Sequence, residues 1–351
     1  PPLRGGEARE LGLVRERADS VAAARKSLGD TLAWFEGYEA ANRATTVEGF
    51  GRLDAVGRIV NQVIRFTSGT KNSVAPNAPA SFPLLWDAPR HDYVQWTGFS
   101  PNAGAGALGR NAGEVVGVFG HVEVKHYETE EDARKGYPST IEQNRIVAME
   151  EALRRLSSPV WPEQILPPID RPLAARGQAL YQTHCASCHA LIDRDDPKRK
   201  VVAMMMGTDV VGTDDAAARA VVEARIPTGI LEGAISPQGG RYGPDAPALA
   251  LVGDLATRIV SRRPDAALKA VASAKLHGLE KTTKQGNYPQ KSAEAPFAEF
   301  MAYKARPLNG VWASAPSPAS DRARRGAIGV APITPATSAS ATSGVMNHMA
   351  S

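Results

Sequence analysis

The feature that most constrains this chain is the segment THCASCHA at residues 183–190. It contains both cysteines of the 351-residue sequence, Cys185 and Cys188, and His189 follows the second one directly. A disulfide across two intervening residues would close too short a loop to stabilise a large domain. The spacing therefore indicates a chemical role for the two thiols, and the fold has to present them together with His189.

The pattern C-x-x-C-H is typical of covalent attachment of c-type haem. Two thiols one helical turn apart can reach the two vinyl groups at one edge of a porphyrin and form thioethers, and the adjacent histidine then faces the iron. The sequence therefore predicts one haem c per chain, bound through Cys185 and Cys188, with His189 as the proximal iron ligand.

Two other chemical roles stay open for the motif. A zinc site needs three or four protein ligands, and no second Cys/His pair lies nearby in the sequence. A thioredoxin-like redox pair would follow a strand of a βαβ unit, whereas this motif comes at the end of a predicted helix. Both patterns therefore fit the segment less well than haem attachment does.

The composition predicts a mainly α fold with long loops, since glycine and proline number 32 and 26 while aromatic residues are only 6% of the chain. Asp170 is the expected N-cap of the helix that leads into the cysteine motif, with Pro172 in its first turn. Ser139 and Glu142 form a capping-box pattern that predicts a helix from Ser139 to about residue 156. Apolar spacing predicts further helices over 10–40, 171–184, 216–225, 247–260, 265–275 and 295–304, and residues 45–130 predict short helices joined by ordered loops.

The proline-rich segment 157–170 predicts a boundary between two regions, because its four prolines prevent a long helix. Residues 1–160 are expected to form a loop-rich helical region, and residues 161–316 a cytochrome c-like domain with one covalent haem. Residues 317–351 contain no leucine and no aromatic residue. Such a segment cannot bury enough apolar surface to order itself, so we expect a disordered tail.

Composition argues against two classes of partner. The formal net charge is only +4, and no dense basic patch with interleaved aromatic residues occurs, so nucleic-acid binding is not expected. No stretch of eighteen apolar residues is present, so no membrane span is expected either. The segment GAGALG at 104–109 fits G-x-G-x-x-G, but it lacks a surrounding βαβ unit and is interpreted as a loop.

Four stretches lie between residues 45 and 316 and read GFGRLDAVGRIVN, FPLLWDAPRHDYVQWTGFSPNAGAGALGRNAGEVVGVFG, RGQALYQTHCASCHALIDRDDPKRKV and YKARPLNGVWASAP. Together they resemble the bacterial di-haem cytochrome c peroxidase superfamily, and most of all its rubber-oxygenase-like branch. The resemblance implies a periplasmic or secreted location, two c-type haem domains and a redox partner protein. It also implies an electron-relay tryptophan near the line between the haems, for which Trp86 and Trp96 are candidates, with ordinary packing as the alternative for each.

The chain departs from that family in two places. It has one C-x-x-C-H motif, and the family's first haem domain would lie upstream of GFGRLDA. The family's second axial histidine follows the segment WASAP in a Tyr-Leu-His-Asn-Gly-Ser context, whereas SPASDRARRG follows here, which suggests a truncated or frameshifted reading. Two functions therefore stay open: a haem protein with electron transfer activity, or a haem-dependent peroxidase or oxygenase whose second haem domain is missing from this chain.

Other ligand-type side chains are expected to have structural roles. The consecutive methionines 204–206 are expected to point three ways around a helix, so at most one could become an axial ligand, and core packing is the preferred interpretation. His91, His121 and His126 are expected to be hydrogen-bonded or on the surface rather than bound to iron.

Overall fold

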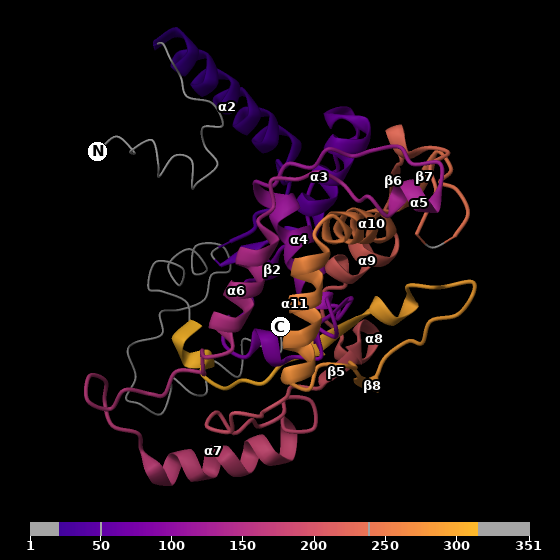
Figure 1. The fold of residues 1–351 in the computed structure, drawn as a ribbon. Coiled ribbons are helices and arrows are strands. Elements are labelled where there is room, and N and C mark those ends of the chain that lie inside the picture. The colour runs from indigo at the N-terminus through magenta and orange to yellow at the C-terminus, as the bar shows by residue number, and fades with distance from the viewer. Residues whose placement is uncertain (1–20, 50, 238, 315–351) are drawn as a thin grey trace.

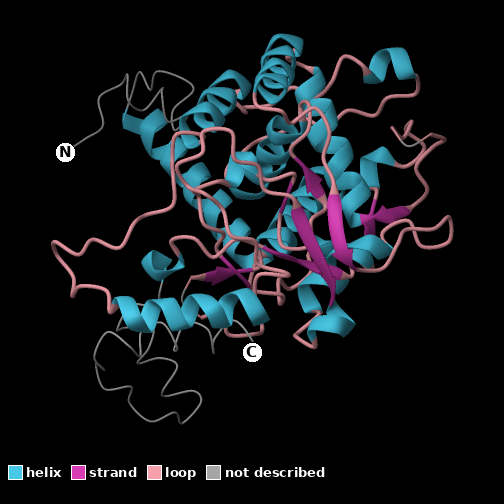
Figure 2. Ribbon diagram, turned by 90° about the horizontal axis from the view of Figure 1, so that it is seen from below, coloured by secondary structure: helices cyan, strands magenta, loops and turns pink. Residues whose placement is uncertain are grey.

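The computed structural model describes residues 21–49, 51–237 and 239–314, and this part of the chain is mainly helical, as predicted (Figures 1 and 2). The expected tail 317–351 lies outside the described residues. The helices are α2 (Val21–Ala41), α3 (Ala55–Ser68), α4 (Gly106–Val118), α5 (Glu130–Ala133), α6 (Gln143–Leu153), α7 (Arg171–His184), α8 (Thr208–Val211), α9 (Ala216–Val222), α10 (Ala248–Ser261) and α11 (Pro264–Leu276). The short strands are β1 (Arg52–Leu53), β2 (Ala80–Ser81), β3 (Tyr93–Val94), β4 (Ser100–Pro101), β5 (Ala203–Gly207), β6 (Arg225–Pro227), β7 (Asp245–Pro247), β8 (Lys284–Asn287) and β9 (Ala302–Ala305).

The main hydrophobic core lies where α3, α4 and α10 pack together. Val63, Ala112 and Leu251 are fully buried at this contact. Gly117 allows the backbones of α3 and α4 to approach closely, since a Cβ atom there would overlap the side chain of Ile59. The predicted boundary near residue 160 stays a prediction, and the buried cluster takes residues from both sides of it.

A small three-stranded sheet has the strand order β8-β5-β9. Strand β5 is parallel to β8 and antiparallel to β9. The three consecutive methionines lie within β5, so the expectation that they lie on a helix was wrong. Side chains alternate along a strand, and Met205 is fully buried while Met204 and Met206 are half-buried. The expected core-packing role is therefore confirmed for Met205.

Two predicted helices differ from the observed elements. The segment 295–304 forms a short 3-10 turn at Ala298–Phe300 followed by strand β9, because its backbone pairs with β5. Ser139 is not a helix cap. It forms an isolated antiparallel bridge with Val122, and α6 begins four residues later, with Glu142 at its N-cap position.

Helix α2 projects from the rest of the molecule (Figure 1). Leu28 and Leu32, on its predicted apolar face, are 70% and 59% exposed. The helix is anchored near its C-terminal end, where the Tyr38 hydroxyl donates a hydrogen bond of 3.1 Å to the Gly117 carbonyl. Among the described residues, no helix combines the length and hydrophobicity that crossing a membrane requires.

Candidate functional site

Helix α7 carries the cysteine motif at its C-terminal end and stands apart from the helical core (Figure 1). It begins as predicted: the Asp170 side chain accepts a hydrogen bond of 2.9 Å from the Leu173 amide, and Pro172 lies in the first turn. No residue of this helix is buried, and Leu180 is 59% exposed. A 14-residue helix is marginally stable in water by itself, so an unburied α7 lacks the packing that stabilises most helices.

The motif itself is a tight turn that holds the two thiols close to the histidine. Cys185 is the C-cap of α7, and its amide donates to the Tyr181 carbonyl at 2.8 Å. The amides of Cys188 and His189 both donate to the Cys185 carbonyl, at 3.1 and 2.8 Å. Both cysteines are half-buried and no disulfide joins them. The thiols are therefore free to react with a group that approaches this face.

Two hydrogen bonds fix the orientation of His189. Its Nδ1 lies 2.7 Å from the backbone carbonyl oxygen of Arg306, and the Tyr181 hydroxyl donates to the His189 carbonyl at 2.5 Å. A carbonyl oxygen only accepts, so the Nδ1 atom must carry a proton, and in the neutral imidazole Nε2 then carries the lone pair. Metal-binding histidines use this tautomer, in which the ring nitrogen that does not bind the metal donates its N–H to a group such as a backbone carbonyl.

These residues fit a c-type haem. Two free thiols lie one turn apart, an imidazole offers its Nε2 lone pair, and the helix beside them leaves its whole surface unburied. The motif follows a helix, whereas the thioredoxin alternative requires a strand. The described part of the chain holds no group of three or more His, Cys, Asp or Glu side chains of the kind that a zinc site uses.

The structure places the two candidate tryptophans differently. Trp86 donates its indole N–H to the backbone carbonyl of Asn309 at 2.8 Å. The side-chain amide of Asn309 in turn donates to the backbone carbonyl of Ile192, just beyond the cysteine motif. Trp96 donates to the Ser81 carbonyl at 2.8 Å and lines a cavity. Both side chains are half-buried and hydrogen-bonded. Of the two tryptophans, Trp86 is joined through Asn309 to the segment that follows the cysteine motif. A role in electron relay stays a prediction for both.

The histidines that the sequence assigns to structural roles have such roles. His121 and His126 are exposed, and His126 Nδ1 lies 2.9 Å from the Ile230 carbonyl oxygen. His91 is buried, and burial together with the neighbouring Lys304 ammonium holds its pKa well below the ordinary value. His91 is therefore neutral, and its Nδ1 lies 3.4 Å from Lys304 Nζ.

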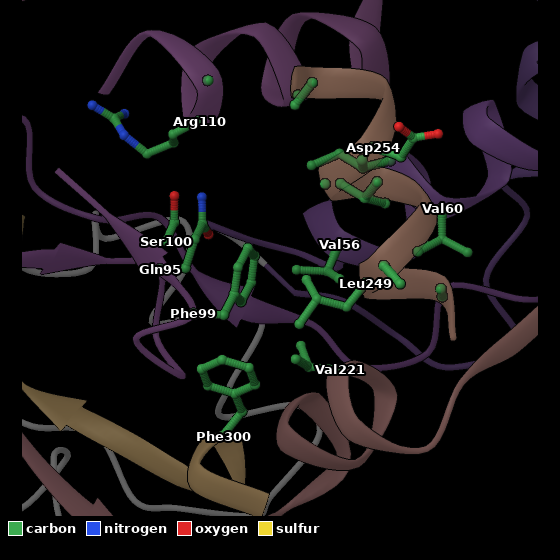
Figure 3. Close-up of a pocket in the computed structure, with 18 of the residues that line it drawn as sticks. Val56, Val60, Gln95, Phe99, Ser100, Arg110, Val221, Leu249, Asp254 and Phe300 are labelled. Atoms are coloured by element: carbon green, nitrogen blue, oxygen red, sulfur yellow. The ribbon is translucent and has the colours of Figure 1, made fainter. Parts of the chain in front are cut away.

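Two adjoining cavities, which sequence reasoning did not anticipate, lie between the core and the small sheet. The larger, of about 450 Å³, is mostly apolar, and Figure 3 shows Phe99 and Phe300 beside Val221 and Leu249. The smaller, of about 260 Å³, is lined by Trp96 and by a set of buried or partly buried ionisable side chains. That set is Asp54, His91, Arg110, Glu114, Glu150, Lys304 and Arg306.

A hydrogen-bonded network occupies the boundary between the two cavities. Arg110 forms an ion pair with Glu150, which also accepts a hydrogen bond of 2.7 Å from Asn111. Glu114 accepts a hydrogen bond of 2.8 Å from Gln95 and lies 3.6 Å from the Arg110 guanidinium. Burial raises the pKa of the Glu114 carboxyl above its ordinary value. The network therefore places a carboxyl that binds protons more readily than usual beside a fixed guanidinium.

Comparison with known proteins leaves the function open. No known protein-family profile matches the chain. It is 28% identical over 295 residues to the uncharacterized protein y4iJ of Sinorhizobium fredii (strain NBRC 101917 / NGR234). That match covers 77% of this chain and 45% of the relative, so the chain spans less than half of the relative's length. No solved structure matches the chain.

Proposed function

We propose that this chain is a c-type haem protein with electron transfer activity, in which one haem is attached to Cys185 and Cys188 and His189 is its proximal iron ligand. The hydrogen bond between His189 Nδ1 and the Arg306 carbonyl carries the proposal. This hydrogen bond orients the ring through a segment distant in sequence and leaves Nε2 for a metal, and metal-binding histidines commonly make a hydrogen bond of this kind.

When bound, the haem supplies reversible one-electron chemistry. The Cys185 and Cys188 sulfurs would hold it as thioethers and His189 would ligate it, while the Tyr181 hydroxyl keeps the backbone of His189 in place. The unburied surface of α7 would cover one side of the group and exclude water, and this contact would compensate for the packing that α7 lacks. Residues 161–316 would then act as the cytochrome c-like domain.

Kinship with the di-haem cytochrome c peroxidase superfamily, a periplasmic or secreted location and a redox partner protein belong to the same proposal. In it, Trp86 is the better candidate for the electron relay, because the Asn309 side chain joins it to the segment just after the motif. Replacing Trp86 with Phe should slow electron transfer to a partner more than the same change at Trp96. Equal rates in both variants would contradict this assignment.

A second candidate is a haem-dependent peroxidase or oxygenase whose second haem domain belongs to a longer protein. The partly exposed Glu114 favours it, because a carboxyl with a raised pKa beside Arg110 and a cavity is suited to acid–base catalysis. The two candidates differ in haem count and in peroxide turnover. The chain by itself should turn over peroxide little faster than a free haem peptide, and robust turnover lost in Glu114→Gln would favour the second candidate.

Production in a bacterial host with c-haem maturation tests the main proposal. The haem should stay with the chain through denaturing electrophoresis, and the reduced pyridine adduct should show both vinyl groups saturated. Cys188→Ala should leave at most one thioether, and Ser187→Ala, which changes the residue beside it, should leave both. A colourless product from the competent host would contradict the proposal.

A further inference from the structure

Two buried cations lie on one face of the segment that contacts His189. Lys304 belongs to strand β9, and Arg306 follows it two residues later, so the two side chains point to the same side of the extended chain. They are only 9% and 8% exposed. Both line the cavity of about 260 Å³.

Neither cation has an anionic partner among the described residues. Lys304 Nζ donates to the Tyr93 carbonyl at 2.8 Å and to the neutral His91 ring. Arg306 Nε is buried and makes no hydrogen bond with the described part of the chain. Asp87, whose charge acts on Arg306, is held at 2.6 Å by the Arg199 guanidinium.

The carboxylates that line the cavity have other partners. Asp54 caps helix α3 through the amide of Gly57, and it accepts a second hydrogen bond from the amide of Ala78. Glu114 and Glu150 both lie against Arg110. The carboxylates of the cavity are therefore held by other groups, and none of them pairs with Lys304 or Arg306.

Buried charges in proteins are normally paired, because removal from water disfavours an isolated ion. Burial lowers the pKa of Lys304 to about 7 and that of Arg306 to about 10, so each position disfavours its own charge when no anion is present. An anion between the two side chains would remove this penalty. A guanidinium and an ammonium together suit a carboxylate, which accepts several hydrogen bonds.

We propose that Lys304 and Arg306 form a binding site for a carboxylate group in this cavity. The volume of about 260 Å³ is below the range typical of pockets for drug-sized ligands, so the site suits a small carboxylic acid or one arm of a larger molecule. A free metabolite is one source. A haem propionate is the other, and that source rests on the proposed function, with the contact of His189 and Arg306 in its support.

The first arm of the test uses the full chain produced without haem and needs no haem chemistry. Acetate and succinate should raise the thermal unfolding midpoint relative to chloride at equal ionic strength. Lys304→Gln and Arg306→Gln should each weaken the apparent affinity at least tenfold, while Arg306→Gln keeps the carbonyl that binds His189. Lys291→Gln and Arg155→Gln, which remove exposed charges, should have no effect. If a variant fails to fold, Lys304→Arg and Arg306→Lys replace it and should retain binding.

The second arm uses the haem-loaded full chain. If the propionate is the ligand, added acetate should no longer stabilise the protein, and the propionate bending band in resonance Raman spectra should shift in Arg306→Gln but not in Arg155→Gln. If acetate still stabilises the loaded protein and the band does not move, the ligand is a free carboxylate. No acetate effect in the first arm together with an unmoved propionate band would overturn the site. Failure to load haem would count against the proposed function alone.

Discussion

The helices α4 and α7 have similar lengths, 13 and 14 residues, but opposite surroundings. Helix α4 is buried along one face by α3 and α10, and Leu108 and Ala112 on it are almost completely inaccessible. Helix α7 has no buried residue, although its N-cap is formed correctly. Local sequence is thus sufficient to begin a helix, whereas its stability depends on a partner surface. No described segment buries α7 in this way.

The largest effect should come from deleting a core side chain. Leu251→Ala in α10 should lower the free energy of unfolding by roughly 2–5 kcal/mol, because Leu251 is completely buried and its loss leaves a cavity. Leu180→Ala in α7 should change it by less than about 0.5 kcal/mol in the haem-free chain. Urea denaturation followed by circular dichroism measures both. Equal losses would show that α7 is packed in solution.

Two glycine replacements should have opposite signs. Gly117→Ala in α4 should destabilise the protein by about 1–3 kcal/mol, because the new methyl group overlaps Ile59. Gly177→Ala in α7 meets no described atom within 4 Å, so it should favour the helix by up to about 1 kcal/mol. The measurement is the thermal midpoint of each haem-free variant. In the haem-loaded chain the benefit at Gly177 should disappear if the haem packs against that glycine.

Haem loading should protect α7 selectively. Limited trypsin digestion of the haem-free chain should cut after Arg176, which is exposed in α7. In the loaded chain, cleavage there should slow at least tenfold, because a bound haem would add packing to the helix. Arg258 in α10 is buried and serves as the internal control. Cleavage after Arg176 at the same rate in both forms would contradict a stabilising contact between haem and α7.

The most gradual effect concerns pH. Burial lowers the pKa of Lys304 to about 7, whereas its ordinary value is 10.5, so between these values the unfolded chain binds more protons than the folded chain. Stability should therefore rise with pH across this window, with a contribution of at most about 1.4 kcal/mol per pH unit, and be independent of this group below it. Denaturation of the haem-free chain at several pH values measures the slope. It should be absent in Lys304→Met and reduced by saturating acetate.

Local patterns predicted several elements well. Asp170 and Pro172 mark the start of α7 within one turn, and α9, α10 and α11 lie where apolar spacing placed them. Helices are formed by contacts three and four residues apart, so their signals lie within a short window of sequence. The tripeptide Met204–Met206 had no such signal. Its strand exists because β8 and β9, about eighty and a hundred residues later in the chain, supply the hydrogen bonds.

The same distinction holds for the site. The sequence by itself determined the chemistry-bearing group, Cys185, Cys188 and His189, because a turn of five residues is enough to bring two thiols and an imidazole together. Only the tertiary structure decided the tautomer of His189, since its Nδ1 partner lies 117 residues away at Arg306. It also decided that Lys304 and Arg306 are buried without an anion, in a segment for which apolar spacing predicted a helix. Burial and charge pairing depend on which distant segments meet, and a local pattern does not contain that information.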